Sequence, residues 1–446
     1  MSSGPGADSA PAPTDDHHDA PLTTFSSLAV RNYRMFFFGS SISNIGTWMQ
    51  RIAQDWLVHE LTGSATAVGI TTALQFLPML LFGLYGGVLA DRFDKRRLLF
   101  VTQSSLGLTG LLLGALTITG HVNVYHVYAL AFVVGVVTVV DNPTRQTFVA
   151  DMVGPRLLPN AVSLNSANFH SARLIGPAVA GVLITAVGGG WAFIVNGLSF
   201  AAPIVGLMMM RSSELNASHR APRRKGQLRE GLRYVGSRPE LLWPIVLVGF
   251  IGTFGFNFPV WAIAFTDGVF DAGAGSYGLL NTLMGAGSVV GALLAARRGS
   301  RRMRFTFAAA ALFSAVLMLS SAAPFFWVYA VLMVPMGLVA MTFQVSSNAG
   351  IQLNTEPEMR GRVISLYMMV FLGGTPIGAP VVGWVTDSFG PRVGMAAGGA
   401  ICLLGTMALA LVLARIGGLR LRIDLRAGRR ALALVPRDPQ PVATTA

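Results

Sequence analysis

A charged turn reads Gly87-Val88-Leu89-Ala90-Asp91-Arg92-Phe93-Asp94-Lys95-Arg96-Arg97, and long apolar segments near residues 65–90 and 98–119 flank it. Each segment is long enough to cross about 30 Å of hydrocarbon as a helix, which satisfies its own backbone hydrogen bonds. Basic residues in short loops stay on the cytoplasmic side of a membrane. The turn therefore predicts a transmembrane helical hairpin whose loop lies in the cytoplasm.

The whole chain follows this pattern. It has 446 residues, of which 52% are hydrophobic and 12% charged, whereas soluble proteins carry about 25% charged residues. Ten further apolar segments fall near residues 35–57, 124–142, 160–187, 191–210, 241–266, 276–297, 303–322, 325–347, 362–386 and 392–416. None alternates polar and apolar residues, which excludes a membrane β-barrel. We expect an all-α polytopic membrane protein with twelve transmembrane helices.

The basic residues predict how the chain is oriented. Of the 33 lysines and arginines, 30 fall on one side of the twelve segments, in alternate loops and beside both termini. Both termini and the central loop are therefore expected in the cytoplasm. The net charge of +13 is explained by anionic lipid at this face, so no nucleic-acid partner is needed. The excess of arginine over lysine indicates a high-GC genome, and hence a bacterial inner membrane.

An internal repeat divides the chain into two halves. Ala161-Val162-Ser163-Leu164 and Gly176-Pro177 align with Val363-Ile364-Ser365-Leu366 and Gly378-Ala379 at a single offset. We expect a disordered cytoplasmic tail over 1–30, six-helix bundles over 31–210 and 241–416, a cytoplasmic central loop over 211–240, and a cytoplasmic tail over 417–446. Repeats of this kind place a transport site between two pseudo-symmetric bundles, near the bilayer midplane.

Several classes of site are absent from the sequence. The single cysteine, Cys402, excludes a disulfide framework and a cysteine-rich metal site. Neither lysine, Lys95 or Lys225, precedes a Ser or Thr, which excludes a P-loop for ATP. The Asp15-Asp16-His17-His18-Asp19 cluster is interpreted as part of a solvated tail, and the N-terminus lacks the pattern of a secretory signal. We expect no cofactor and no metal, and a monomer that binds a small molecule, protons and lipid.

These features together resemble the major facilitator superfamily. The turn after the second segment resembles that superfamily's 2–3 loop signature, with Asp94 in place of its second Gly, and Gly176-Pro177 resembles its antiporter signature. A narrower resemblance, to the enterobactin-exporter-like branch, lies in Ile45-Gly46-Thr47-Trp48-Met49, Leu61-Thr62-Gly63-Ser64-Ala65 and Asp141-Asn142-Pro143-Thr144-Arg145-Gln146. The resemblance implies the major facilitator fold and export of siderophores or drugs.

The turn that follows the second segment is a candidate gate. Asp91 is placed where a carboxylate can meet a helix N-terminus and an arginine, and Gly87 permits close helix packing. We expect Gly87, Asp91, Arg92 and Arg96 to form a cytoplasmic latch that holds the halves together while the site faces outward. A simple role in membrane topology is the alternative for the basic residues. The corresponding loop of the second half lacks the acid.

The first segment carries the most informative charges. Asn44, Trp48, Arg51 and Asp55 recur at helical spacing and share one face. Charged side chains inside a membrane helix usually face a cavity, and Arg51 and Asp55 are spaced to pair along the helix. We expect Asp55 to take up a proton or meet a cationic group of the substrate, with Arg51 tuning it. A static ion pair is the alternative.

The fifth segment places His170 and Arg173 shortly before Gly176-Pro177. An arginine at this depth needs a partner, which could be a substrate anion or an acid on another helix. His170 titrates near neutrality, although a helix–helix hydrogen bond is the more common role for it. We expect Gly176, Pro177 and Gly181 to form a hinge or a tight packing point, because proline kinks a helix; their antiporter role is implied by the resemblance.

The seventh segment spaces Phe250, Phe254, Asn257 and Trp261 on one face of a continuous helix. Large aromatic side chains with one amide suit a wide apolar site, so Phe254, Asn257 and Trp261 are candidates for the substrate cavity. Aromatic residues at this spacing also serve in plain helix packing.

Two functions on this fold are consistent with the sequence. The first is a secondary exporter that exchanges protons for its substrate, and the second is a nutrient importer. A membrane enzyme would need a clustered nucleophile, base or metal set, and a scaffold would need a sizeable soluble domain. The sequence has neither.

Overall fold

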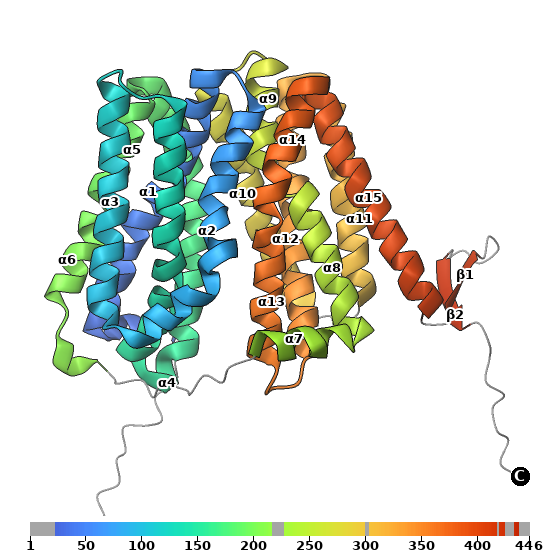
Figure 1. Cartoon of the computed structure of the whole chain (residues 1–446), viewed down its shortest axis with the longest axis horizontal. Coiled ribbons are helices and arrows are strands. Elements are labelled where there is room, and N and C mark those ends of the chain that lie inside the picture. Colours follow the sequence, from blue (N-terminus) through green and yellow to red (C-terminus); the bar gives the residue numbers. More distant parts are fainter. Residues whose placement is uncertain (1–22, 216–226, 299–302, 417–418, 424–431, 437–446) are drawn as a thin grey trace, which may run out of the picture.

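The computed structural model describes residues 23–215, 227–298, 303–416, 419–423 and 432–436 (Figure 1). Helices make up nearly all of this, and the first half of the chain contains η1 (Ser26–Ala29), α1 (Arg31–Thr62), α2 (Ala65–Arg92), α3 (Lys95–Ile118), α4 (Val124–Val187), α5 (Gly189–Ser199), α6 (Ala201–Met209) and η2 (Ser212–Glu214). The second half contains α7 (Gln227–Gly236), α8 (Pro239–Phe254), α9 (Phe258–Gly268), α10 (Ala274–Arg298), α11 (Met303–Ser321), α12 (Phe326–Leu353), α13 (Arg360–Gly373), α14 (Thr375–Phe389) and α15 (Pro391–Ile416).

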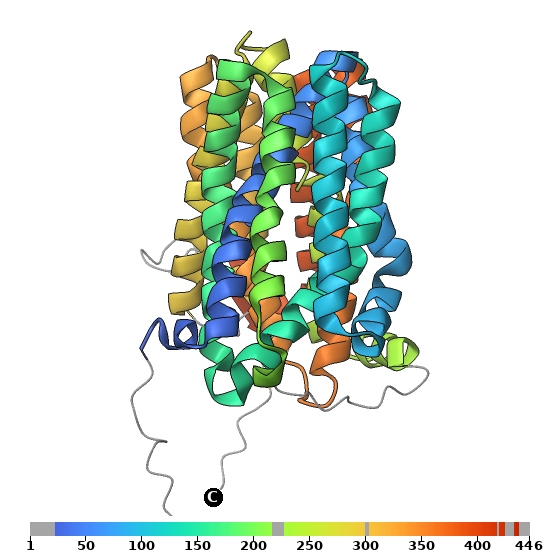
Figure 2. The same ribbon diagram turned by 90° about the vertical axis from the view of Figure 1, so that its left-hand side faces the viewer.

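The helices stand side by side in two bundles, α1–α6 and α8–α15, while α7 lies across one end (Figures 1 and 2). We call the end with α7 the lower end and the opposite end, where α1 passes into α2, the upper end. Within the described residues, ten helices or helix pairs are long and apolar enough to cross a membrane. Together with α1 and the second arm of α4, this is consistent with the twelve crossings expected from the sequence. The all-α, two-bundle fold is confirmed.

One expected loop is helical instead. The segments near 124–142 and 160–187 both belong to α4, which consists of two helices joined by a kink at Gly154, where φ is 70° and ψ is 173°. Glycine adopts this positive φ without the strain that a Cβ would bring. The turn lies at the lower end, where Asp151 meets Lys95 at the start of α3 and Asn160 meets Ser27. The two arms of α4 therefore run down from the upper end and back to it.

Three expected continuous spans are each broken into two helices. The breaks fall at Phe200 between α5 and α6, at Gly255–Asn257 between α8 and α9, and at Gly374 between α13 and α14. A proline follows each break closely, namely Pro203, Pro259 and Pro376. Proline has no N–H to donate and clashes with the preceding turn, which explains why the helix restarts there.

Short parts of both expected tails fall within the described residues. The segment 1–22 lies outside the described residues, but 23–30 pack on the first bundle, where Asn160 accepts from Ser27 and donates to the carbonyls of Thr23 and Thr24. After α15, β1 (Leu419–Ile423) and β2 (Leu432–Pro436) pair antiparallel, Leu419 opposite Pro436. Part of the segment expected as a cytoplasmic tail, 417–446, is thus a hairpin, which is the exception to the all-α body.

Candidate transport site

The middle of α1 holds an arginine between two aromatic rings. The guanidinium carbon of Arg51 lies 5.0 Å from the ring centroid of Trp48, one turn earlier on α1, and 5.5 Å from that of Phe76 on α2. Asn44 lies one turn further toward the lower end. Trp48 and Arg51 are half-buried. Cation–π contact stabilises a guanidinium without neutralising its charge.

The second arm of α4 brings another arginine to the same indole. The guanidinium carbon of Arg173 lies 5.5 Å from the ring centroid of Trp48. Phe169 lies edge-on to Trp48 with ring centroids 5.6 Å apart, and His170 follows it at 5.7 Å. The structure thus brings together three residues that the sequence placed on two separate segments, Trp48, Arg51 and Arg173, while His170 contacts its neighbour Phe169.

Neither arginine has a carboxylate partner among the residues that the structure describes. Arg51 does not form the expected ion pair with Asp55, because its guanidinium turns toward Trp48 and Phe76 instead. Arg173 likewise makes only its contact with Trp48. A charge inside a membrane-spanning helix without a counter-charge is costly, and it usually faces a cavity or a substrate pathway.

Asp55 instead faces the other half of the molecule. Its side chain is 3% exposed, and its Oδ2 accepts a hydrogen bond of 3.1 Å from the hydroxyl of Tyr277 on α10. The ring of Tyr277 also lies 6.2 Å from that of Trp56 on α1. Tyr277 is 222 positions away in the chain, and no pattern in a single sequence points to it.

The second half contributes less than the sequence suggested. The break at Gly255–Asn257 separates Phe254 on α8 from Trp261 on α9, so the expected single face does not exist. Trp261 is fully buried, and a Cβ at Gly398 on α15 would meet its ring at 2.5 Å. Asn257, 2% exposed, donates to the carbonyl of Thr253. In this arrangement both residues pack inside the second bundle.

The two halves are joined at the upper end by a carboxylate on α14. Asp387 accepts hydrogen bonds from the Ser64 hydroxyl (2.7 Å), the Ala65 N–H (2.8 Å), the Thr66 N–H (2.9 Å) and the Thr66 hydroxyl (2.6 Å). These groups form the N-terminus of α2, where unpaired N–H groups and the helix dipole favour an anion. We call this contact the Asp387 clasp.

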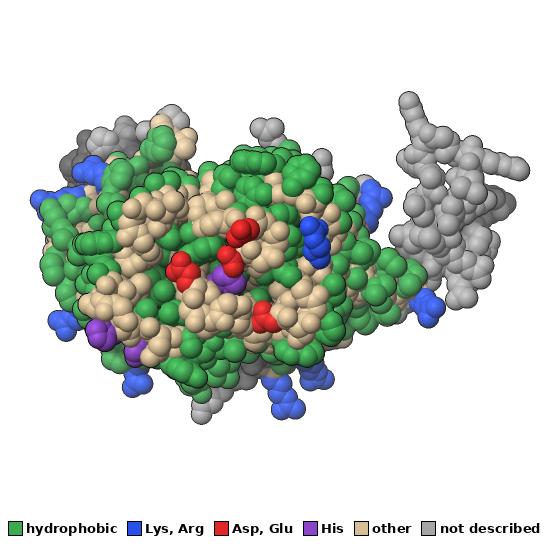
Figure 3. All heavy atoms as spheres, turned by 90° about the horizontal axis from the view of Figure 1, so that it is seen from above, with side chains coloured by type: hydrophobic (Ala, Val, Ile, Leu, Met, Phe, Trp, Pro, Cys, Tyr) green, Lys and Arg blue, Asp and Glu red, His purple; other side chains and the backbone are tan. Residues whose placement is uncertain are grey.

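A second pair joins the halves close to the clasp. The Nε2 atom of His59 on α1 lies 2.9 Å from Oδ2 of Asp267 on α9. Acidic side chains gather around a histidine near the middle of the upper face (Figure 3). Gly383 on α14 fits so closely against α2 that an added Cβ would lie 2.6 Å from the Cα of Thr66. The upper ends of the halves are therefore in tight contact.

The candidate gate residues lie at the lower end. Asp91 and Arg92 are exposed at the end of α2, whereas Arg96 donates to the carbonyls of Leu207 and Met208 in its own half. A close helix approach is present at the neighbouring Gly86, whose added Cβ would meet Val139 of α4. In the arrangement described, Arg96 is thus committed to α6 rather than to the other bundle.

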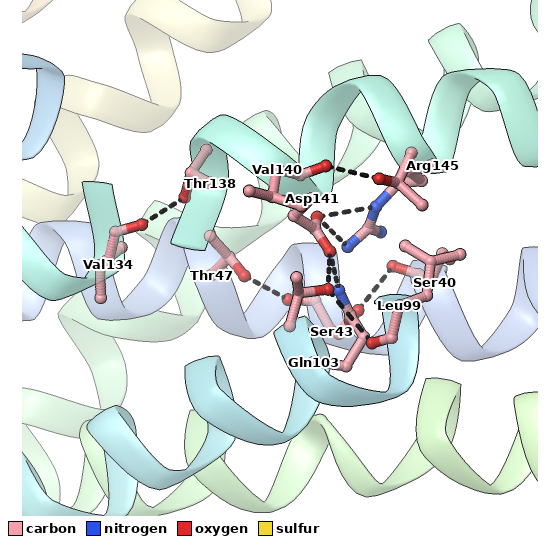
Figure 4. Close-up of polar contacts among 12 residues, drawn as sticks. Ser40, Ser43, Thr47, Leu99, Gln103, Val134, Thr138, Val140, Asp141 and Arg145 are labelled. Carbon is pink, nitrogen blue, oxygen red and sulfur yellow. Dashed lines mark hydrogen bonds and ion pairs between the residues drawn. The ribbon is translucent and has the colours of Figure 1, made fainter. Parts of the chain in front are cut away.

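A buried acid that the sequence assigned no role, Asp141, lies between Gln103 and Arg145 in the first half (Figure 4). Asp141 on α4 is 3% exposed and accepts from the hydroxyl of Thr102 (2.7 Å) and the amide of Gln103 (2.6 Å), both on α3. Arg145, one turn along α4, pairs with its other oxygen at 3.1 Å. In the sequence, the position of Asp141 directly after an apolar run was the feature that could have indicated a buried acid. All of its partners belong to the first half.

Gly176, Pro177 and Gly181 are packing positions on the second arm of α4. A Cβ at Gly176 would lie 2.5 Å from Cβ of Trp48, and one at Gly181 would lie 3.2 Å from the carbonyl of Gly275 in the other half. The backbone of α4 stays helical at Pro177 and departs from helical angles at Gly154. Gly176 thus lets α4 approach α1 closely beside the arginines. Among the described residues, no cluster of His, Cys, Asp and Glu is suited to hold a metal.

Two bundles of apolar helices around a polar cluster between α1 and α4 define a secondary transporter of the major facilitator fold. The chain matches the family model of transmembrane secretion effectors over residues 22–420, and it belongs to that family. The family consists of membrane transporters rather than enzymes, so this chain is a multi-pass transporter of small molecules.

Curated relatives cover most of the chain. It is 24% identical over 362 residues to the staphyloferrin A transporter of Staphylococcus aureus, which spans 80% of this chain and 90% of the relative. It is also 24% identical over 368 residues to the multidrug efflux pump Tap of Mycolicibacterium fortuitum, across 80% and 89% of the two chains. Among solved structures, a bacterial homologue of the human lysosomal transporter Spinster, titled inward-facing and occupied, is similar at a TM-score of 0.67. It is 13% identical, covering 89% and 98% of the chains, which supports the fold alone.

Proposed function

We propose that this protein is a proton-coupled exporter of a small molecule such as a siderophore, drug or secondary metabolite, working by alternating access in a bacterial inner membrane. The similarity to a siderophore transporter and a drug efflux pump supports export. The basic loops support a cytoplasmic location for the lower end and both termini. On this assignment the closed upper end makes the described state inward-facing.

The contact between Asp55 and Tyr277 is the observation that carries the proposal. It places a carboxylate, buried in one half, under a hydrogen bond from the other half. Opening the upper end must separate α1 from α10, and so must break this bond and expose Asp55 to the outside. A group whose surroundings change with the conformation is able to couple a proton to that change.

The cycle follows from this geometry. In the inward-facing state Asp55 is ionised and accepts from Tyr277, and the substrate enters from the cytoplasm to the cluster around Trp48. When the upper end opens, the substrate leaves, Tyr277 withdraws, and Asp55 takes up a proton from outside. Closure returns the proton to the cytoplasmic side and restores the hydrogen bond from Tyr277 to Asp55. Latch contacts around Asp91 hold the lower ends of the two halves together in the outward-facing state. The close packing of α4 at Gly176, Pro177 and Gly181 is the point about which α4 rotates relative to the other half.

Transport into everted vesicles tests this function. A panel of siderophores and hydrophobic drugs is first screened in an efflux-deficient host, and the best substrate is then added to energised everted vesicles. We expect substrate-dependent release of the proton gradient, read with a pH-sensitive dye. Asp55→Asn should abolish this release and uphill transport, while exchange of labelled for unlabelled substrate continues.

Glu60→Gln is the matched control. Glu60 is one turn beyond on the same helix and, among the residues that the structure describes, accepts a hydrogen bond from Trp56 of α1 alone, so its loss should leave proton release near the wild-type level. Full uphill transport in Asp55→Asn would refute Asp55 as the proton site. Accumulation in right-side-out vesicles instead of everted ones would show that the protein is an importer.

A further inference from the structure

The cluster around Trp48 has an excess of positive charge. Two guanidinium carbons lie 5.0 and 5.5 Å from the centroid of one indole ring, so they are at most about 10.5 Å apart. The carboxylate of the same region, Asp55, is bonded by Tyr277 and is not within ion-pair distance of either arginine. Two cations thus stand against one acid within the membrane-spanning helices α1 and α4.

We propose that Arg51 and Arg173 form an anion site, and that the transported substrate carries a carboxylate or a similar acidic group beside an aromatic or apolar body. This inference rests on the proposed function and specifies its substrate class. Guanidinium groups bind carboxylates through two parallel hydrogen bonds, which are stronger than those between neutral groups. An anion between the two arginines removes the cost of leaving them unpaired in a membrane.

The surroundings suit the rest of such a molecule. Trp48 is half-buried, and Phe169, 47% exposed, lies edge-on to it. Phe76 forms the other side of Arg51. Aromatic faces beside the arginines offer apolar contact to the body of the substrate while the guanidiniums hold its charged end. A cationic drug would meet repulsion from both arginines at the same place.

The charge of the substrate also bears on the driving force. Export moves a negative charge out of a cell whose interior is negative, so the membrane potential assists it. A cationic substrate would be opposed by the same potential. An interior-negative potential should therefore accelerate transport of the substrate in intact cells at constant pH gradient.

Binding of three matched probes to the purified full-length protein tests the site. The probes are 2-naphthoate, 2-naphthamide and 2-naphthylmethylammonium, which share a ring system and differ in charge. We expect naphthoate to bind at least tenfold more tightly than the other two. Raising the salt concentration should weaken naphthoate alone. Equal or tighter binding of the amide or the ammonium compound, or no binding of naphthoate, would overturn the proposal without any mutation.

Substitution of the arginines assigns the effect to them. Arg51→Gln and Arg173→Gln should each lower naphthoate affinity at least tenfold and leave naphthamide unchanged, and the Lys variants should fall between. Arg304→Gln is the control, because Arg304 also lies over an aromatic ring, Phe305, but is exposed on α11. Unchanged naphthoate affinity in both Gln variants would overturn the anion site. If the wild type still exports cationic or neutral compounds in that case, the anion site is refuted but the export function is not.

Discussion

The two ends of the interface between the halves are built differently. At the upper end, the charged groups bond across the interface, as in the Asp387 clasp and the pair of His59 with Asp267. At the lower end, Lys95 pairs with Asp151 within the first half, and Arg362 pairs with Glu230 within the second. Opening the upper end therefore costs bonds, whereas each half retains these lower ion pairs when it moves.

This difference separates two effects that a mutation can have. Loss of a bond across the interface should shift the balance between the inward- and outward-facing states, because that bond exists in one state alone. Loss of a bond within one half should lower the stability of that half and leave the balance in place. The expected effects below are ordered from the largest to the smallest.

The buried Asp141 network should give the largest loss of stability. Asp141→Ala removes the partner of Arg145 and leaves the amide of Gln103 without its acceptor, at a cost of about 3 kcal/mol. Unfolding of the purified protein in SDS, followed by circular dichroism, measures it. Removing Arg145 as well should recover part of the loss, since no unpaired guanidinium then remains.

Asp141→Ala also tests whether a bond within one half affects the contact between the upper ends of the two halves. Because every partner of Asp141 lies in the first half, the distance between the upper ends should match that of the wild type. Spin labels at Leu61→Cys and Phe389→Cys, on a Cys402→Ala background, report this distance. A large opening in Asp141→Ala would show that the network does more than stabilise one bundle.

The Asp387 clasp should give the largest shift between states. Asp387→Asn removes the charge that caps α2 and at least one of its four hydrogen bonds. We expect the closed upper end to lose about 2 kcal/mol, a change of roughly 30-fold in the ratio of closed to open molecules. The same spin-label pair should show a new, longer distance. Glu60→Gln, at the same end but bonded within α1, should leave the distances unchanged.

The sequence predicted the periodic part of this molecule and missed its long-range pairs. Apolar length and basic loops were sufficient for the spans and the halves, and helical spacing placed Trp48 and Arg51 on one face. The partners Tyr277 and Asp387 belong to the opposite half from the groups that they bond, and helical spacing contains no information about a residue more than 200 positions away. The direction of a helix face can be read from a sequence, but the residue that meets it depends on how the bundles dock.

The errors inside single spans have a different cause. The face expected over Phe254, Asn257 and Trp261 assumed one straight helix, and a single break at Gly255–Asn257 rotates the residues beyond it. Pro259 was visible in the sequence and indicates such a break. The helical turn around Gly154 was harder to foresee, because Pro155 and Pro159 normally indicate a loop.

The exposed pair of Arg362 on α13 with Glu230 on α7 should give the smallest effect. Its atoms lie 2.7 Å apart, but Glu230 is 61% exposed, so water and salt weaken the attraction. Arg362→Gln should therefore change the free energy of unfolding by less than about 1 kcal/mol. The distance between the upper ends should also remain unchanged, because both partners belong to the second half and move together. A shift comparable to that of Asp387→Asn would mean that α7, which lies across the lower end, restrains the halves directly, and the contrast between the two ends would then no longer hold.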